Sequence, residues 1–300
     1  MGVQLFQAQI NLMIQFVVIL LISIGSFVHA SSLEQADHME NYIAKTYFEK
    51  YDSLIERIFD NYIANEIPLG LSEVITDKNH VMPALSELER RIIGEGSHRR
   101  LSSSIRFKLQ PELKSELTAH SCEVIIIERL PSGVFADPFE LQHLVQRGVF
   151  TDAAVFGDTN LELPSFCANR SVVEVHMSIP SKVLSRYEDD LDVNVEVPLH
   201  ARYPPLGVDF SRVEFGQPDL LICCSTEENA LNRSCLSMPT NDISDYKGSP
   251  VIWDIPCGIK EHATVVSAVI FGFAIVTAVL IVLTSICYSD SQGSNKIKKQ

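Results

Sequence analysis

The sequence predicts a mostly β protein: an amphipathic helical segment, then an antiparallel β-sandwich, then one C-terminal transmembrane helix. Short β-branched runs fill much of the stretch from residue 98 to 255, apolar residues recur at helical spacing near residue 50, and one long stretch near the C-terminus has no charge. The expected order is a signal peptide (1–30), a helical segment (31–95), the sandwich (96–260), the membrane helix (263–286) and a tail (287–300).

The first 30 residues indicate a signal peptide. They contain no charged side chain, and Leu12–Ile24 is an apolar run of the length found in signal peptides. Val28 and Ala30 place small residues at the −3 and −1 positions of a cleavage site before Ser31. An uncleaved anchor is the alternative, because only the amino terminus supplies positive charge.

The segment that follows has helical periodicity. Between Tyr47 and Ile63, apolar residues recur at steps of three and four while charged residues fill the other face, which predicts one amphipathic helix ending before Pro68. This helix either packs on its own domain or docks on a membrane partner. The stretch ALSELERRII (84–93) predicts a further short helix, followed by turn signals at Gly94 and Gly96.

From about His98 the sequence changes to short runs that alternate apolar and polar residues. Val193, Val195 and Val197 give one such alternation, and proline, glycine, asparagine and aspartate separate the runs. No alternation of strands with helices occurs, so an antiparallel sandwich is expected. The predicted strands are SSIRFKL, CEVIIIERL, SVVEVHMSI, DVNVEVPLHARY, RVEFGQPDLLICC and VIWDI.

The uncharged stretch 263–286 predicts the membrane helix. At about 1.5 Å per residue it reaches roughly 36 Å, enough for a hydrocarbon core about 30 Å thick. The lysine-rich tail after it indicates a cytosolic C-terminus, which places the larger part of the chain in the lumen. Lys296 and Lys298 resemble a dilysine retrieval signal of the endoplasmic reticulum, and a simple stop-transfer cluster is the alternative.

Glycosylation sequons and cysteines agree with a luminal domain. Asn169 and Asn232 each begin a sequon without an intervening proline. Once the cysteine beside the membrane is set aside, an even number remains, which suits an oxidising compartment but leaves fifteen pairings open. Adjacent cysteines are expected to have separate partners. The disulfide candidates are Cys122, Cys167, Cys223, Cys224, Cys235 and Cys257.

The sequence offers little catalytic chemistry. It contains no nucleophile elbow and no glycine-rich phosphate loop, and no zinc site is predicted because no Cys-x-x-Cys spacing occurs. The acidic pair Asp190 and Asp192 predicts a solvated turn rather than a sugar-nucleotide site. We expect no cofactor, and the net charge of −14 argues against a nucleic-acid partner.

Two apolar or aromatic stretches are candidate interaction sites. In RLPSGVFADPFELQHL, Pro131 and Gly133 predict a turn, and Asp137 with Pro138 predicts the start of a short helix. Its aromatic residues either close the end of the sandwich core or anchor a partner or the membrane. In PLHARYPP, the polar residues either hold an acidic group or serve a structural role. The candidate residues are Val134, Phe135, Asp137, Pro138, Phe139, His200, Arg202 and Tyr203.

These segments together resemble the PIG-X family of glycosylphosphatidylinositol (GPI) biosynthesis. The resemblance runs through GSHRRL, SCEVIIIERLPSGVFADPFEL, PLHARYPP, QPDLLICC and IPCGIKEH and covers about residues 96–286. Residues 31–95 have no clear counterpart, and Cys122 and Cys224 fit the cysteine pattern of the family.

The resemblance implies a non-catalytic luminal subunit of the endoplasmic-reticulum membrane. Its partner would be a multi-spanning catalytic subunit similar to PIG-M, which transfers the first mannose of the GPI anchor. The alternative is a cargo receptor of the GOLD type, but the segment before the membrane has no heptads and the tail has no phenylalanine. The absence of a recognisable set of catalytic residues argues against an enzyme in its own right.

Overall fold

The computed structural model describes residues 42–67, 84–109, 121–179, 190–207, 209–225, 233–238 and 250–297, without the side chains of Arg233 and of 286–297. The expected signal peptide lies outside these residues. The chain divides into two compact units, 1–67 and 68–300, and each is described by itself.

The described part of the first unit, residues 42–67, contains two short helices where the sequence predicts one. Helix α2 (Ile43–Lys50) is followed by Tyr51, whose backbone is extended, and α3 (Glu56–Asn65) begins five residues after Tyr51. The hydroxyl of Tyr47 fixes this break, because it donates to the carbonyl of Ser53 at 3.2 Å and accepts from the amide of Ile55 at 3.3 Å. The prediction of a continuous helix is therefore wrong, although residues of its predicted apolar face, such as Tyr47 and Phe59, are buried.

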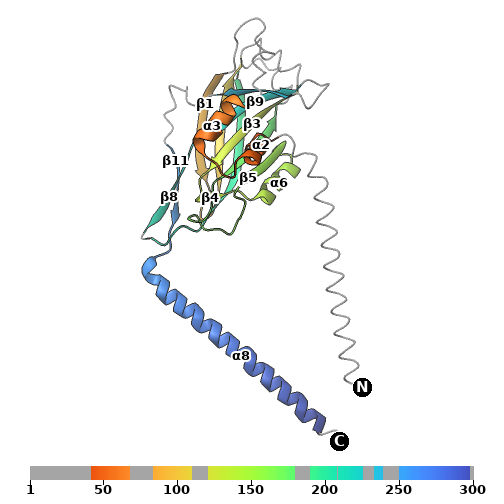
Figure 1. Ribbon diagram of the computed structural model, residues 1–300, viewed down its shortest axis with the longest axis vertical. Helices are drawn as coiled ribbons and strands as arrows, with labels where there is room; N and C mark the ends of the chain where they lie inside the picture. Colours follow the sequence, from red (N-terminus) through yellow and green to blue (C-terminus); the bar gives the residue numbers. More distant parts are fainter. Residues whose placement is uncertain are drawn as a thin grey trace. The chain divides into compact units, whose positions relative to one another are not determined.

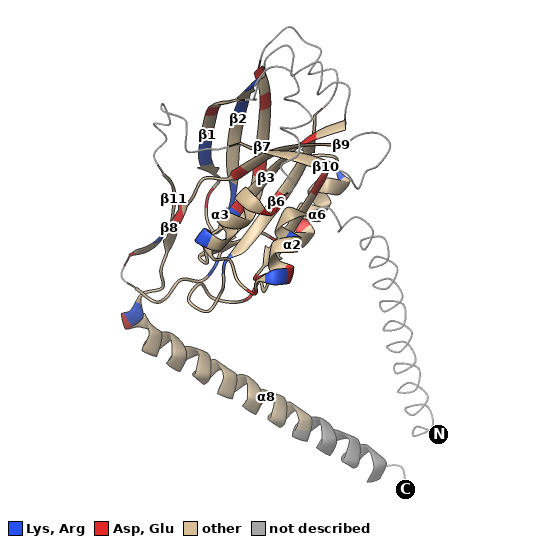
Figure 2. Cartoon of the chain, turned by 45° about the horizontal axis from the view of Figure 1, so that its top comes forward, with Lys and Arg blue, Asp and Glu red and all other residues tan. Residues whose placement is uncertain are grey.

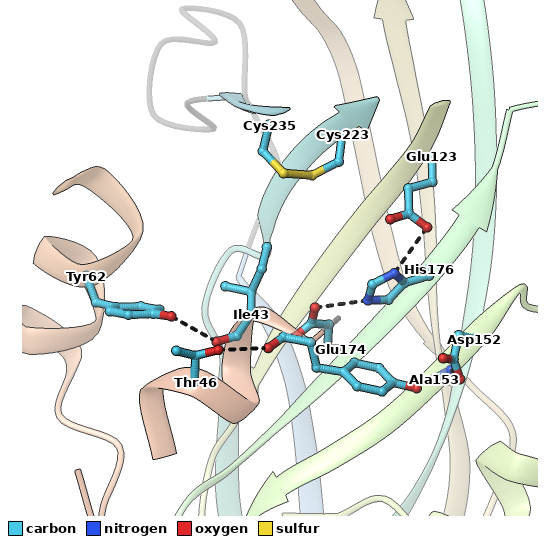
Figure 3. A network of polar contacts seen from close by, with 11 residues as sticks. Ile43, Thr46, Tyr62, Glu123, Asp152, Ala153, Glu174, His176, Cys223 and Cys235 are labelled. Carbon is cyan, nitrogen blue, oxygen red and sulfur yellow. Dashed lines mark hydrogen bonds and ion pairs between the residues drawn. A yellow bond between two sulfur atoms is a disulfide. The ribbon is translucent and has the colours of Figure 1, made fainter. Parts of the chain in front are cut away.

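Aromatic side chains hold the two helices together. The ring of Tyr47 lies 4.8 Å from that of Phe59 and 5.5 Å from that of Tyr62, measured between centroids. The hydroxyl of Tyr62 donates to the carbonyl of Ile43 at 3.3 Å, so a side chain of α3 satisfies the backbone at the start of α2 (Figure 3). The residues that recur at helical spacing thus pack helix against helix within this unit.

The second unit is a β-sandwich, as the sequence predicts (Figure 1). One sheet has the order β1-β2-β7-β4, the other has the order β10-β9-β3-β6-β5, and β11 pairs with β8 in a separate ribbon; all pairings are antiparallel. The strands are β1 (Ala84–Ile93), β2 (His98–Lys108), β3 (Ser121–Leu130), β4 (Val134–Phe135), β5 (Asp152–Gly157), β6 (Ser171–Ser178), β7 (Asp190–Ala201), β8 (Phe210–Phe215), β9 (Asp219–Ser225), β10 (Arg233–Met238) and β11 (Val251–Pro256).

Strand β1 replaces a helix predicted from the sequence. Its residues are strong helix formers, but every second side chain from Leu88 through Arg90 to Ile92 is at least partly buried, and the strand pairs with β2 along its length. Tertiary pairing overrides local propensity here. The acidic pair at the start of β7 was also assigned wrongly to a turn, because both residues lie in the strand and Asp192 accepts from Arg106 at 2.7 Å.

Both sheets and the ribbon of β8 and β11 contribute to one buried core. Alternation along β7 directs Val193, Val195 and Val197 inward, and Trp253 of β11 is fully buried in the same cluster. The predicted run RVEFGQPDLLICC is split by Gly216, Gln217 and Pro218 into strands of two different sheets. The core therefore joins strands that lie far apart in the sequence.

Two disulfides connect neighbouring strands of the five-stranded sheet. Cys122 of β3 bonds to Cys224, and Cys223 bonds to Cys235 of β10. Cys223 and Cys224 are successive residues of β9, so they point to opposite faces of the sheet and reach different strands. The expectation of separate partners for the adjacent pair is confirmed.

A buried ion pair crosses the sandwich. Arg90 of β1 contacts Glu128 of β3 at 2.6 Å, and both side chains are almost inaccessible. Arg90 also donates to the carbonyl of Gly216 and to the hydroxyl of Ser103. Burial raises the pKa of the Glu128 carboxyl, and the guanidinium of Arg90 opposes that shift.

A short connection leads from the sandwich to the apolar helix. The amide of Cys257 donates to the carbonyl of Asp209, and Gly207 forms a bridge with Ile259. One turn of 3-10 helix (Lys260–His262) precedes α8 (Ala263–Ile297). The 26 residues Lys260–Ser285 are long and apolar enough to cross a membrane, and Figure 2 shows charge only at the start of this stretch.

Candidate interaction site around the histidine stack

The structure brings together the two stretches that the sequence analysis singled out. Strand β4, inside the loop after β3, pairs with the end of β7, so that Val134 faces Ala201 and Phe135 faces His200. On the other side of β7, His98 of β2 faces the same His200. Three aromatic side chains therefore lie side by side across three strands.

Local chemistry fixes the turn that leads into β4. The amide of Val134 donates to the carbonyl of Pro131 at 3.1 Å, and the carbonyl of Gly133 accepts from the amide of Arg202 at 2.9 Å. A Cβ atom at Gly133 would lie 2.5 Å from a methyl group of Val213, closer than side-chain atoms can approach. Glycine is thus required here by packing.

The aligned side chains form what we call the histidine stack: His98, His200, Phe135 and Arg202. The two imidazole rings are 4.2 Å apart and nearly parallel, and the Phe135 ring stacks on His200 at 5.0 Å. The guanidinium of Arg202 lies 4.9 Å from the centre of the Phe135 ring, a cation–π contact. Cross-strand pairing thus orders four side chains in one column.

Helix α6 (Pro138–Gln146) adds a carboxylate to the histidine stack. The Asp137 side chain accepts from the amide of Phe139 at 2.9 Å, and Pro138 occupies the first turn, so the predicted N-cap is confirmed. Glu140, in that first turn, lies 3.3 Å from Nε2 of His98 and 3.1 Å from Nε2 of His200. One carboxylate therefore bridges both imidazoles.

Arg202 anchors the loop between β5 and β6. Its side chain is buried and donates to the carbonyls of Asn160, at 2.6 Å, and Leu163, at 3.0 Å. Burial lowers the pKa of the Arg202 guanidinium, and Asp158 opposes that shift, so the group remains a cation at neutral pH. Its hydrogen bonds to these carbonyls correspond to the structural role considered for PLHARYPP.

The eight candidate residues have different positions in the structure. Val134 and Arg202 are buried, Phe135 and His200 are partly buried in the histidine stack, and Asp137 and Pro138 start α6. Phe139 and Tyr203 are 80% and 82% exposed. Phe139 therefore does not close the end of the core, and these two aromatic side chains are available for contact with another molecule.

A second polar cluster lies on the five-stranded sheet (Figure 3). His176 of β6 is buried, and its ring contacts Glu123 at 3.2 Å and Glu174 at 3.0 Å. Burial lowers the pKa of His176, but the hydrogen bonds to the two carboxylates outweigh it and raise the pKa to about 9. The imidazole is therefore a cation at neutral pH.

The remaining candidates are described in part. Cys167 is exposed and Cys257 is partly buried, and both carry free thiols. Asn169 is exposed, and its backbone amide donates to Asp158 at 2.8 Å. Asn232 and Lys298 lie outside the described residues, as does the side chain of Lys296.

Comparison with known families decides what kind of protein carries this arrangement. The family described as PIG-X / PBN1 matches residues 94–287, almost two thirds of the chain. The chain belongs to the PIG-X / PBN1 family. The match begins just after β1, spans the histidine stack and ends within α8, so the strands from β2 to β11 and most of the apolar helix lie in the matched region.

Curated relatives agree with the assignment to PIG-X / PBN1. The human protein named "GPI alpha-1,4-mannosyltransferase I, stabilizing subunit" is 24% identical over 219 residues, which cover 67% of this chain and 80% of the relative. The rat and mouse proteins of the same name are each 23% identical, with 67% of this chain and 82% and 81% of their own length covered.

Sequence reasoning missed two members of the site. His98 stands in GSHRRL and Glu140 in the DPFEL segment, and both segments support the resemblance to PIG-X / PBN1. Neither residue was assigned a contact, because residues 98, 140 and 200 are far apart in the sequence. The cross-strand partner of His200 was the missing information, and only the sheet register supplies it.

Proposed function

We propose that this chain is the stabilising, non-catalytic subunit of GPI mannosyltransferase I, in complex with a multi-spanning catalytic subunit similar to PIG-M. The observation that carries the proposal is the match to three mammalian proteins, each named as the stabilising subunit of this enzyme, over two thirds of this chain. The matched region of the family includes the strands from β2 to β11 and most of the apolar helix.

The composition of the apolar helix supports catalysis in the partner rather than in this chain. A GPI anchor is built on a membrane lipid, so its mannosyltransferase requires an active site within or beside the membrane, where ionisable groups mark functional sites. From Ala263 to Ser285 the helix has no charged side chain. We infer that the catalytic carboxylates belong to the partner, and that this chain supplies binding surface.

The exposed aromatic side chains next to the histidine stack support a role in binding the partner. Phe139 and Tyr203 are rigid, large and accessible, which is the character of residues that dominate binding energy in interfaces. The residues beneath them are fixed by the N-cap of α6 and by the hydrogen bonds of Arg202. We propose that this surface contacts the catalytic subunit.

We further propose a luminal orientation in the endoplasmic-reticulum membrane, with a glycan on Asn169. The exposed position of Asn169 and the two cross-strand disulfides support this orientation. The mobility of the protein on gels should increase after endoglycosidase H treatment, and Asn169→Gln should remove part of that shift. A protein insensitive to the glycosidase would contradict the orientation.

The functional test is loss of the chain in its own cells. Without it, GPI-anchored proteins should be depleted from the cell surface, and re-expression of the wild-type chain should restore them. A variant truncated before Lys260 tests whether the apolar helix is needed in the same assay. Normal surface levels of GPI-anchored proteins in cells lacking the chain would rule out the proposed function.

A further inference from the structure

Three metal-type ligands converge at one end of the four-stranded sheet. His98 comes from the start of β2, His200 from the end of β7 and Glu140 from the first turn of α6. One ligand atom from each residue lies within 4.8 Å of the other two. Three separate elements thus bring two imidazole nitrogens and a carboxylate oxygen close together.

The donor set selects a class of metal ion. Two imidazoles and one carboxylate are the ligands of three-residue zinc sites, which leave the fourth position to water or to another molecule. Calcium and magnesium prefer shells made entirely of oxygen, whereas only Glu140 of these residues offers oxygen. With both histidines neutral, Glu140 gives the group one negative charge, which favours a dication.

Neighbouring side chains hold two of the three ligands in place. Glu140 is fixed by the N-cap that Asp137 provides to α6, and the imidazole of His200 stacks on the ring of Phe135. Their side chains are 33% and 28% exposed, so solvent and ions can reach them. This is the support by neighbouring groups that fixes the orientation of metal ligands in proteins.

The third ligand has room to adjust. In the structure Glu140 contacts Nε2 of both imidazoles, and the two rings are almost parallel, so their nitrogen lone pairs do not meet at one point. His98 must therefore turn to share an ion with His200. Its side chain is 54% exposed and stands at the edge of the stack, which leaves it free to do so.

From this geometry we propose that His98, Glu140 and His200 bind one divalent ion of the zinc type. Binding replaces the hydrogen bonds of the carboxylate with coordinate bonds and ties β2, β7 and α6 together. Because α6 also carries the exposed Phe139, the ion fixes the helix that presents this side chain. The proposal concerns metal binding by this chain and does not depend on the proposed function.

The test is titration of the purified full-length chain in detergent micelles with Zn²⁺, after removal of metal by a chelator. Wild-type protein should bind one equivalent, and saturating Zn²⁺ should raise its unfolding temperature, because the ion binds the folded state. His98→Gln and Glu140→Gln should each weaken binding at least tenfold. His98→Gln is the more informative variant, because the His98 side chain is exposed and its loss leaves the core intact.

Two matched variants separate this site from other ligands. His143→Gln removes an exposed histidine of the same helix, and Cys167→Ser removes an exposed thiol. Both should bind Zn²⁺ as the wild type does. Binding that survives His98→Gln unchanged, binding that is lost in Cys167→Ser, or the absence of any binding by the wild type would each overturn the proposal.

Discussion

At the scale of single residues, the sandwich pairs the ionisable side chains that it buries. His176 lies between Glu123 and Glu174, and Asp152 of β5 is its register partner across the sheet. Arg90 and Glu128 pair between the two sheets. Such groups stay charged in a buried position only when oppositely charged partners compensate them. Each therefore makes stability depend on a specific contact.

The charge of His176 predicts how stability changes with pH. Its pKa is raised to about 9 in the folded state, so its contribution is complete below the unfolded pKa of about 6.5 and is lost as pH rises through 9. We expect the difference in unfolding free energy between the wild type and His176→Gln to shrink between about pH 7 and pH 9.5. Denaturant titrations across that range measure it. A difference that stays constant would show that the imidazole is neutral when folded.

Loss of one partner from the buried ion pair should be costly. Glu128→Gln leaves the Arg90 guanidinium buried without a counter-charge, for which about 3–5 kcal/mol is typical. The matched control is Glu87→Gln, which removes an exposed ion pair with Arg106 and should cost far less, because solvent screens that pair. Chemical unfolding of the three proteins gives the comparison. Equal losses in the two variants would contradict the assignment of Glu128 as the critical residue.

At the scale of elements, local signals predicted part of the structure. The Asp137–Pro138 helix start and the alternating strand at Val193–Val197 are confirmed. Both could be predicted because a helix cap and a two-residue period depend only on residues that are adjacent in the sequence. The helix predicted for residues 84–93 is wrong, because these helix-forming residues pair with β2 in the folded sheet. The break between α2 and α3 depends on hydrogen bonds of the Tyr47 hydroxyl, which periodicity cannot reveal.

The candidate site could be predicted only as two separate segments. The loop around Phe135 and the segment around His200 were each identified from composition, but their contact depends on the pairing of β4 with β7. The convergence of His98, Glu140 and His200 depends in addition on the register between β2 and β7. Distances along the chain contain no information on that register, so no metal-type cluster was expected.

The exposed aromatic side chains beside the histidine stack, Phe139 of α6 and Tyr203 just after β7, are predicted to contribute to binding of the catalytic subunit. Phe139→Ala with Tyr203→Ala should leave the chain folded, because both side chains are mostly exposed, but should reduce co-purification with the catalytic subunit several-fold. The matched control is Phe210→Ala, an aromatic residue of β8 that is 64% exposed. Co-purification that falls equally in the control would indicate a general loss of surface hydrophobicity.

At the scale of the whole molecule, the chain combines a disulfide-linked sandwich with a helix of membrane-spanning length. The two are joined by a short connection in which Gly207 and Ile259 form a bridge. A longer stalk would let the sandwich move away from the membrane, and this connection keeps it near the start of the helix. Such an arrangement suits a subunit that acts by contact with a membrane-embedded partner.

The central claim is that this chain stabilises a catalytic subunit, and the half-life of that subunit tests it most directly. The catalytic subunit should be followed after protein synthesis is blocked, in cells that lack this chain and in cells that re-express it. The account predicts rapid loss of the catalytic subunit without the chain and a restored half-life with the wild type. An unchanged half-life in cells lacking the chain would contradict the account.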